Sequence, residues 1–99
     1  MFEIRFTQRV ADKLKSLEQN PAYKGLVKQI KKTVAFLENN PRHPSLNTHT
    51  YHEIPHPFMP GEKIFEAYAQ NNTPSAYRLL GCYGPEKKQI TILAITHHP

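Results

Sequence analysis

The sequence has no tryptophan, a single cysteine and no long apolar run. Its longest uninterrupted apolar stretch, Ile92–Ile95, falls far short of the roughly 20 residues that a membrane-spanning helix needs. The first residues also lack the hydrophobic region of a signal peptide, so we expect a cytoplasmic protein with no membrane segment. Cys82 has no second cysteine with which to form an intrachain disulfide, which fits a reducing compartment.

The length of the chain allows only one domain. Compact domains run to roughly 100–150 residues, and 99 residues leave no room for a second core. Nine prolines and four glycines argue against an all-helical bundle, because proline interrupts helices and central strands. We therefore expect residues 1–99 to form a single domain of mixed structure with a modest core.

Positive charge is concentrated in the first half of the chain. Residues 1–50 carry nine Lys or Arg and four Asp or Glu, whereas residues 51–99 carry four of each, so the net charge of +5 comes from the first half. A concentrated basic region suits a polyanion such as RNA or DNA, or an acidic protein partner. A lysine-rich helix face that is merely solvated explains the same pattern equally well.

Hydrophobic periodicity predicts one strand and two helices in the first half. Residues 2–6 alternate apolar and charged side chains, the pattern of a strand with one buried face. Residues 8–19 repeat apolar residues at helical spacing, and Thr7 is suited to cap that helix. A second helix is expected over residues 21–38, because an Asn-Pro pair before it favours a helix start. The lysines of this second helix lie opposite its apolar side. We therefore expect the two helices to form a hairpin whose inner face is apolar and buried.

The second half predicts a loop followed by three strands. Residues 41–61 hold five of the nine prolines, and only residues 48–54 within them are able to extend, so this segment is a long ordered loop or an edge element. Strand patterns follow at residues 64–70, 76–83 and 89–96. The order predicts an α+β fold in which an N-terminal strand is followed by a helical hairpin that packs on one face of an antiparallel β-sheet.

Residues 52–56 match H-E-x-x-H, a zinc-protease signature that requires both histidines on one face of a helix. Pro55 lies inside the match, and proline in a helix interior costs roughly 3 kcal/mol. We therefore reject the helical zinc site. A looser site formed by His43, His49, His52 and His56 is the remaining alternative, but histidines in a polar loop are more often simply exposed, so we predict no metal and no cofactor.

Arg78 is the residue that most needs an explanation. It lies in an otherwise apolar strand, where an unpaired guanidinium is costly to bury. Either a carboxylate or an anionic ligand would satisfy it. Glu66 is the nearest carboxylate in the neighbouring strand pattern, so a simple cross-strand ion pair is one alternative and a ligand site is the other. Two histidines, His97 and His98, directly continue the last strand.

These residues carry a resemblance to a known family. The segment YRLLGCYG (residues 77–84), a short turn and then ITILAITHHP (residues 90–99) resemble the RelE/ParE superfamily of bacterial toxins, in which a helical hairpin packs on an antiparallel sheet. The segment Phe-Glu-Ala-Tyr (residues 65–68) resembles a cyanobacterial-type branch of that group. The resemblance covers nearly the whole chain and implies the toxin of a type II toxin–antitoxin system, with an antitoxin encoded beside it as partner.

The resemblance further implies metal-independent endoribonuclease activity on mRNA, commonly on the ribosome. A ribose 2′-hydroxyl would attack its own 3′-phosphate, which needs a base, positive charge and an acid. By position, Arg78 matches the family arginine that holds the scissile phosphate, and His98 matches the C-terminal histidine that acts as acid, with His97 as its substitute. Glu66 is then the candidate base.

Three further residues complete the predicted site. Lys63 is the second choice for the base, and Tyr68 or Tyr83 would stack on a nucleobase or assist the acid. Two alternatives stay open at this stage. One is a ParE-like toxin that binds DNA gyrase through its lysine-rich helix without hydrolysing anything, and the other is a degenerate, inactive toxin domain.

Overall fold

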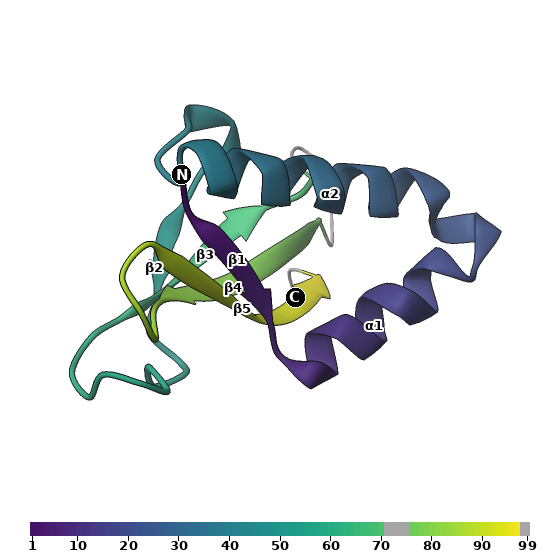
Figure 1. Ribbon diagram of the computed structural model, residues 1–99. Coiled ribbons are helices and arrows are strands. Elements are labelled where there is room, and N and C mark those ends of the chain that lie inside the picture. Colours follow the sequence, from purple (N-terminus) through teal and green to yellow (C-terminus); the bar gives the residue numbers. More distant parts are fainter. Residues whose placement is uncertain (71–75, 98–99) are drawn as a thin grey trace.

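The computed structural model describes residues 1–70 and 76–97, whose helices lie against a five-stranded sheet (Figure 1). The elements are β1 (Glu3–Phe6), α1 (Gln8–Glu18), α2 (Lys24–Asn39), β2 (His49–Tyr51), β3 (Ile64–Tyr68), β4 (Tyr77–Tyr83) and β5 (Gln89–His97), with short 3-10 turns at Pro21–Tyr23 and Pro44–Leu46. The strands are ordered β1-β5-β4-β3-β2. The predicted α+β fold, with its N-terminal strand and helical hairpin, is confirmed.

The two helices begin where the sequence provides caps. The Thr7 hydroxyl accepts a hydrogen bond from the Val10 N–H at 3.2 Å, as predicted, and this satisfies one of the free donors at the start of α1. The Asn20 side chain accepts from Ala22 N–H, but the turn that follows is a 3-10 helix. The α-helix therefore begins at Lys24, three residues later than the proline pattern predicts.

The strands pair antiparallel from β2 to β5, whereas β1 lies parallel to β5. The sheet is thus mixed, not wholly antiparallel. A parallel neighbour needs a long crossover connection, and the helical hairpin with the rest of the chain supplies it. Phe6 at the end of β1 is 39% exposed, so only the first part of this strand buries its apolar side as predicted.

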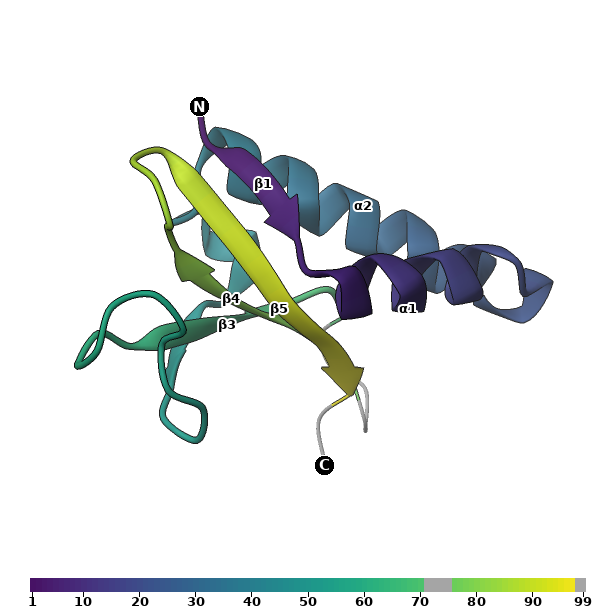
Figure 2. The same cartoon turned by 60° about the horizontal axis from the view of Figure 1, so that its bottom comes forward.

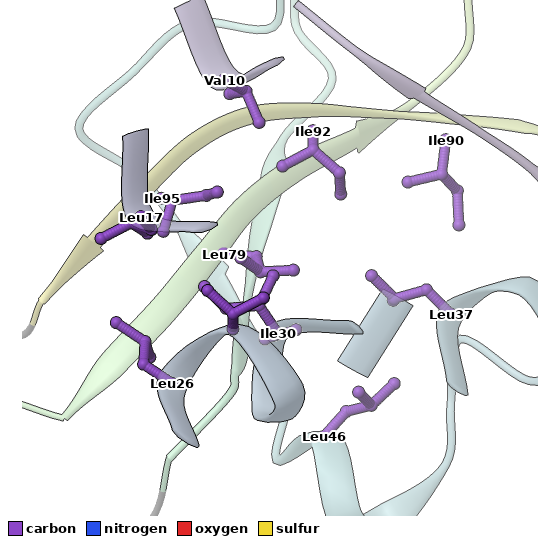
Figure 3. Packing of buried hydrophobic residues seen from close by; sticks show 12 residues of the cluster. Val10, Leu17, Leu26, Ile30, Leu37, Leu46, Leu79, Ile90, Ile92 and Ile95 are labelled. Atoms are coloured by element: carbon purple, nitrogen blue, oxygen red, sulfur yellow. The ribbon is translucent and has the colours of Figure 1, made fainter. Parts of the chain in front are cut away.

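Both helices cover the same face of the sheet (Figure 2). Their buried residues meet the apolar side chains of β4 and β5 in one core, and Figure 3 shows ten of them labelled. These are Val10 and Leu17 from α1, Leu26, Ile30 and Leu37 from α2, Leu46, and Leu79, Ile90, Ile92 and Ile95 from the strands. Within the described ranges, neither helix is long and apolar enough to cross a membrane.

The opposite face of the sheet carries a second, smaller buried cluster. Ile64, Leu80 and Cys82 form it, and burial raises the pKa of the Cys82 thiol. The proline-rich loop after β2 is fixed to the end of β4 by His56, whose Nε2 lies 3.0 Å from the Tyr83 carbonyl oxygen. The other ring nitrogen of His56 accepts hydrogen bonds from two backbone N–H groups of the same loop, each at 3.1 Å. His56 thereby closes the loop on itself and attaches it to the sheet.

Candidate functional site

Arg78 and Glu66 form an ion pair on the face of the sheet that the helices leave open. The guanidinium Nη1 donates to the Glu66 Oε2. Arg78 is directly opposite Tyr68 on β3, and Glu66 is two residues before Tyr68, so the two side chains share one face and meet diagonally. Each residue is 8% exposed. The cross-strand ion pair left open by the sequence is therefore present.

This ion pair does not use all of the hydrogen-bonding capacity of Arg78. Its Nε is buried and has no hydrogen-bond partner among the described residues. The guanidinium carbon lies 5.1 Å from the centre of the Tyr51 ring, in cation–π range. A buried donor without a partner costs about 1–3 kcal/mol, and an oxygen atom of a ligand would remove that cost. Arg78 is thus held from two sides and retains one buried N–H that has no partner among the described residues.

Tyr51 is itself held by a neighbour. Its hydroxyl donates to the Glu53 carboxylate at 2.7 Å. That hydrogen bond raises the pKa of the Tyr51 phenol above its usual value, so the phenol stays neutral and remains a donor at ordinary pH. The ring is consequently oriented at its hydroxyl end by Glu53, while Arg78 lies against its face.

Arg78 lines a cleft of about 650 Å³. Helix α1 packs against β5, whereas Tyr51 lies on β2 at the edge of the sheet, with β4 and β3 between β5 and β2. The lining residues are Arg9, Val10, Asp12 and Lys13 from α1, Tyr51 and Ile54 from the segment around β2, and Arg78, Leu80, Ala94, Ile95 and Thr96 from β4 and β5. One side of the cleft is therefore charged and the other is aromatic and aliphatic.

The charges in the cleft do not balance. Three cationic side chains, Arg9, Lys13 and Arg78, line it together with one carboxylate, Asp12, and Arg78 is already paired with Glu66, so the excess is one positive charge. Asp12 accepts a hydrogen bond from Gln8 at 2.9 Å. Within the described part of the chain, Arg9 and Lys13 form no ion pair. The cleft thus presents net positive charge in a partly enclosed space, where an anion is attracted more strongly than on an open surface.

Two of the tyrosines predicted to contact substrate lie in different places. Tyr68 is paired with Arg78 across β3 and β4 and shares its face, with the His49 ring 6.0 Å away. Tyr83 lies on the opposite face, because residues an odd number apart on a strand alternate. Its ring contacts Phe2 and Phe65, at 5.7 and 5.6 Å between ring centres. The structure therefore separates Tyr83 from Arg78.

Lys63 is exposed, precedes β3 and does not line the cleft. His97 is paired with Tyr77, and their rings stack at 5.1 Å with 14° between the planes. Tyr77 packs against the core beneath the helices, so His97 lies on the face opposite Arg78. The geometry does not bring His97 to the site, and His98 lies outside the described residues.

The H-E-x-x-H match at residues 52–56 is not helical. Its first histidine is exposed, and its second is His56, which holds the loop to β4. As predicted, this segment does not form the helix that the motif would need, because Pro55 lies inside it.

Arg9, Lys13, Tyr51 and Ile54 are among the lining residues of the cleft that sequence reasoning missed. The sequence does contain a signal for Arg9 and Lys13. Their spacing of four residues places both on one side of a helix. Nothing local in the sequence marks the other two, because they reach the cleft through the pairing of β2 with β3.

Comparison with known proteins identifies the fold. No protein-family model matches the chain, and no curated protein matches its sequence. Solved structures do match. The YoeB–YefM toxin–antitoxin complex from Staphylococcus aureus contains a chain that superposes with a TM-score of 0.67 at 16% identity, covering 100% of this chain and 99% of that one. The chain has the RelE-like fold.

The same conclusion comes from the RelE–RelB complex of the archaeon Pyrococcus horikoshii OT3. It matches with a TM-score of 0.65 at 16% identity and covers 97% of this chain and 93% of that chain. The resemblance to the RelE/ParE superfamily predicted from residues 77–99 is therefore confirmed at the level of the fold. On this RelE-like fold, the Arg78 cleft extends from α1 to the face of the sheet that the helical hairpin leaves uncovered.

Proposed function

We propose that this protein is the toxin of a type II toxin–antitoxin pair and that it cleaves RNA without a metal ion. Two findings support a toxin role: the chain shares its fold with YoeB, which was solved in a toxin–antitoxin complex, and with RelE, which was solved with RelB. The observation that carries the catalytic part is the unpartnered buried Nε of Arg78 in a cationic cleft.

The reaction we propose starts with the ribose 2′-hydroxyl. Its oxygen attacks the adjacent 3′-phosphorus, a new P–O2′ bond forms, and the bond from phosphorus to the 5′-oxygen of the next nucleotide breaks. A base takes the 2′ proton and an acid gives a proton to the leaving 5′-oxygen. The products are a 2′,3′-cyclic phosphate and a 5′-hydroxyl, so neither water nor an oxidant enters the cleavage step.

Arg78 acts on the phosphate in this proposal. Its Nε would donate to a non-bridging oxygen and stabilise the charge that develops there. Glu66 keeps the guanidinium in place through Nη1 and is also the carboxylate proposed to take the 2′ proton. His98 is the proposed acid, since an imidazole with an ordinary pKa of roughly 6.5 is suited to proton transfer near neutrality.

Cleavage of a defined RNA tests the proposal. Wild-type protein is incubated with mRNA in the presence and absence of ribosomes, and the product ends are analysed. We expect cyclic phosphate and 5′-hydroxyl ends that form in the presence of EDTA. Arg78→Ala should reduce the cleavage rate by about 10²–10³, the usual effect of removing one charge-stabilising donor. Undiminished cleavage by folded Arg78→Ala would refute the role of this residue.

The gyrase-binding alternative lacks a comparable observation. It depends on the lysines of α2, one of which, Lys31, forms a 3.1 Å ion pair with Glu18 on the helix surface. A toxin of that kind would lose activity in Lys28→Ala but not in His98→Ala. Measurement of growth inhibition by both variants distinguishes the two functions, and the ribonuclease predicts the opposite result for each.

The partner proposed with this function is the antitoxin encoded beside the toxin. Because the chain has a pI of about 9.5, an acidic partner is expected. Co-purification of the product of the adjacent reading frame tests this expectation.

A further inference from the structure

We propose that His56 is a pH-sensitive latch. The neutral ring holds the loop of residues 52–63 against β4, and uptake of one proton by the ring releases that loop from the sheet. The proton comes from solvent and adds to Nδ1, and no bond within the chain is broken. The inference does not depend on the proposed ribonuclease function.

The hydrogen bonds of His56 define one protonation state of its ring. Nδ1 accepts from the backbone N–H groups of Phe58 and Met59, each at 3.1 Å, so this nitrogen carries no hydrogen. Nε2 lies 3.0 Å from the Tyr83 carbonyl oxygen, which can only accept, so Nε2 carries the hydrogen and donates. The residue is 8% exposed. The neutral ring with its hydrogen on Nε2 therefore satisfies all three contacts in a buried position.

A protonated ring does not fit the same contacts. Both nitrogens of an imidazolium are donors, so a hydrogen on Nδ1 would point at the N–H groups of Phe58 and Met59. These two groups would lose their acceptor, which is costly where water does not reach. When the loop opens, water accepts from the ring and from both backbone groups. The open loop thus binds one proton more than the closed loop, and acid shifts the equilibrium towards opening.

Few other interactions hold this loop. Its large apolar side chains Ile54, Phe58 and Met59 are 39%, 42% and 46% exposed, so burial stabilises the closed position only weakly. The Glu62 N–H donates to the Met59 carbonyl oxygen, but this bond lies within the loop. Among the described residues, the remaining hydrogen bond to a strand comes from Tyr51, which immediately precedes the loop. Loss of the His56 contacts is therefore sufficient to free residues 55–60.

Charged groups around the loop do not offset this loss. The titratable groups on the loop, on the end of β4 and on the turn beside Met59 are Glu53, Glu62, Lys63, Cys82, Tyr83, Glu86, Lys87 and Lys88. Within the part of the chain that the structure describes, no carboxylate forms an ion pair with His56. Glu53 already accepts from the Tyr51 hydroxyl. A proton on His56 thus gains no counter-ion that would keep the loop closed.

Opening of the loop would also change the cleft. Ile54 lines the cleft together with Tyr51, and it lies two residues before His56. When the latch releases, Ile54 is no longer fixed at the wall of the cleft. The latch therefore makes this wall sensitive to acidification.

Hydrogen exchange of the wild-type protein tests the latch. NMR measures the protection factors of the Phe58 and Met59 amides, corrected for the intrinsic exchange rate at each pH. The range from about pH 7.5 to about pH 5.5 spans the titration of an imidazole, at roughly 6.5, and stays above that of exposed carboxyls, at roughly 4. We expect both protection factors to fall at acid pH, with a slope that approaches about tenfold per pH unit because one proton is taken up.

Two further measurements on wild type locate the effect. The amide of Leu79, in the helix-covered core, should keep its protection, which shows that the loop opens without unfolding of the domain. The ¹⁵N chemical shifts of the His56 ring at about pH 7.5 should show the hydrogen on Nε2. Protection that does not change with pH, or a hydrogen on Nδ1 at neutral pH, would overturn the latch.

Two matched variants assign the titration to one ring. In His56→Asn, the side-chain oxygen takes the place of Nδ1 and still accepts from backbone N–H groups two and three residues on, but it does not titrate. We expect its protection factors to be independent of pH. The control His52→Asn removes an exposed histidine of the same loop and should keep the wild-type pH dependence. The same slope in His56→Asn as in wild type, or loss of the slope in His52→Asn, would assign the effect to another group and refute the latch.

Discussion

The helix-covered face of the sheet and the opposite face bury different kinds of side chain. The first is filled by aliphatic residues from α1, α2, β4 and β5. The second has a smaller apolar cluster and, beside it, a buried ion pair and a cationic cleft. Apolar packing on one face supplies stability, and this allows the other face to hold charges that are costly to bury.

The largest decrease in the free energy of unfolding is expected when one partner of the Arg78–Glu66 ion pair is removed. Arg78→Ala leaves the Glu66 carboxylate buried and unpaired, which should lower the free energy of unfolding by about 3–5 kcal/mol. Arg78→Met/Glu66→Leu makes this face resemble the helix-covered one and should recover most of the stability, but not RNA cleavage. Urea denaturation measures both variants. A double variant as unstable as Arg78→Ala would show that apolar packing cannot replace the pair.

The helix-covered face should respond to the loss of volume alone. Leu79 is fully buried between both helices and the sheet, so Leu79→Ala should destabilise the protein by about 2–5 kcal/mol through poorer packing and a cavity. Its neighbour in sequence, Arg78, remains in the cleft. RNA affinity measured well below the melting temperature should therefore stay unchanged, and a large decrease in affinity would mean that the two faces are coupled.

Glu66→Gln separates the two roles of the carboxylate. The amide oxygen still accepts from the Arg78 guanidinium, but it cannot take the 2′ proton. If Glu66 is the base, single-turnover cleavage should fall by about a hundredfold or more while RNA affinity persists. Nearly full activity in Glu66→Gln, together with a large loss of activity in Glu66→Ala, would assign Glu66 to positioning only.

A smaller effect is expected at the loop that follows β2. His56→Ala leaves the Tyr83 carbonyl and two backbone N–H groups without their partner, at an expected cost of about 1–3 kcal/mol. The buried Cys82 thiol reports on the opening of this face, because burial raises its pKa and keeps it protonated and unreactive. Thiol-specific labelling at fixed pH should be faster in His56→Ala than in wild type. Unchanged labelling and hydrogen exchange of the loop would contradict this role of His56.

The smallest change in the free energy of unfolding is expected when an ion pair on the outer surface of the helices is removed. Lys31 and Glu18 form an exposed ion pair, with side chains 62% and 42% exposed. Lys31→Ala should change the free energy of unfolding by less than about 0.5 kcal/mol, because solvent and salt screen such pairs. Thermal unfolding at low and high salt measures this difference. A decrease above about 1 kcal/mol, the upper end for exposed pairs, would show that α1 and α2 depend on this contact.

Prediction from the sequence succeeded where the signal is local. Helix periodicity, the Thr7 cap and the alternation along residues 76–83 each depend on residues close together, and all three agree with the structure. In β5 the alternation is interrupted by an irregularity of register opposite Leu80 and Gly81. The face that Arg78 and Glu66 share depends on the register of β3 against β4, which the sequence left open. The parallel pairing of β1 with β5 was not predicted, because it joins the two ends of the chain, as in the pair Glu3 and Gln89, and leaves no local pattern.

The candidate site was predicted only in part for the same reason. Strand alternation within residues 77–83 already separates Tyr83 from Arg78, whereas the position of Tyr68 on the face of Arg78 follows from the register of β3 against β4. Arg9 reaches the cleft from α1, which packs against β5, and Tyr51 reaches it from β2 at the edge of the sheet. Their convergence follows from the order of strands in the sheet, which no spacing along the chain reveals.

The pairing of β1 with β5 also has a consequence during synthesis. The charged side of the cleft is made early, on α1, whereas Ala94 and Thr96 are made near the end. A nascent chain that has not yet released β5 from the ribosome leaves β1 without its neighbour and the cleft without part of its base. The cleft is therefore complete only after the last strand has emerged.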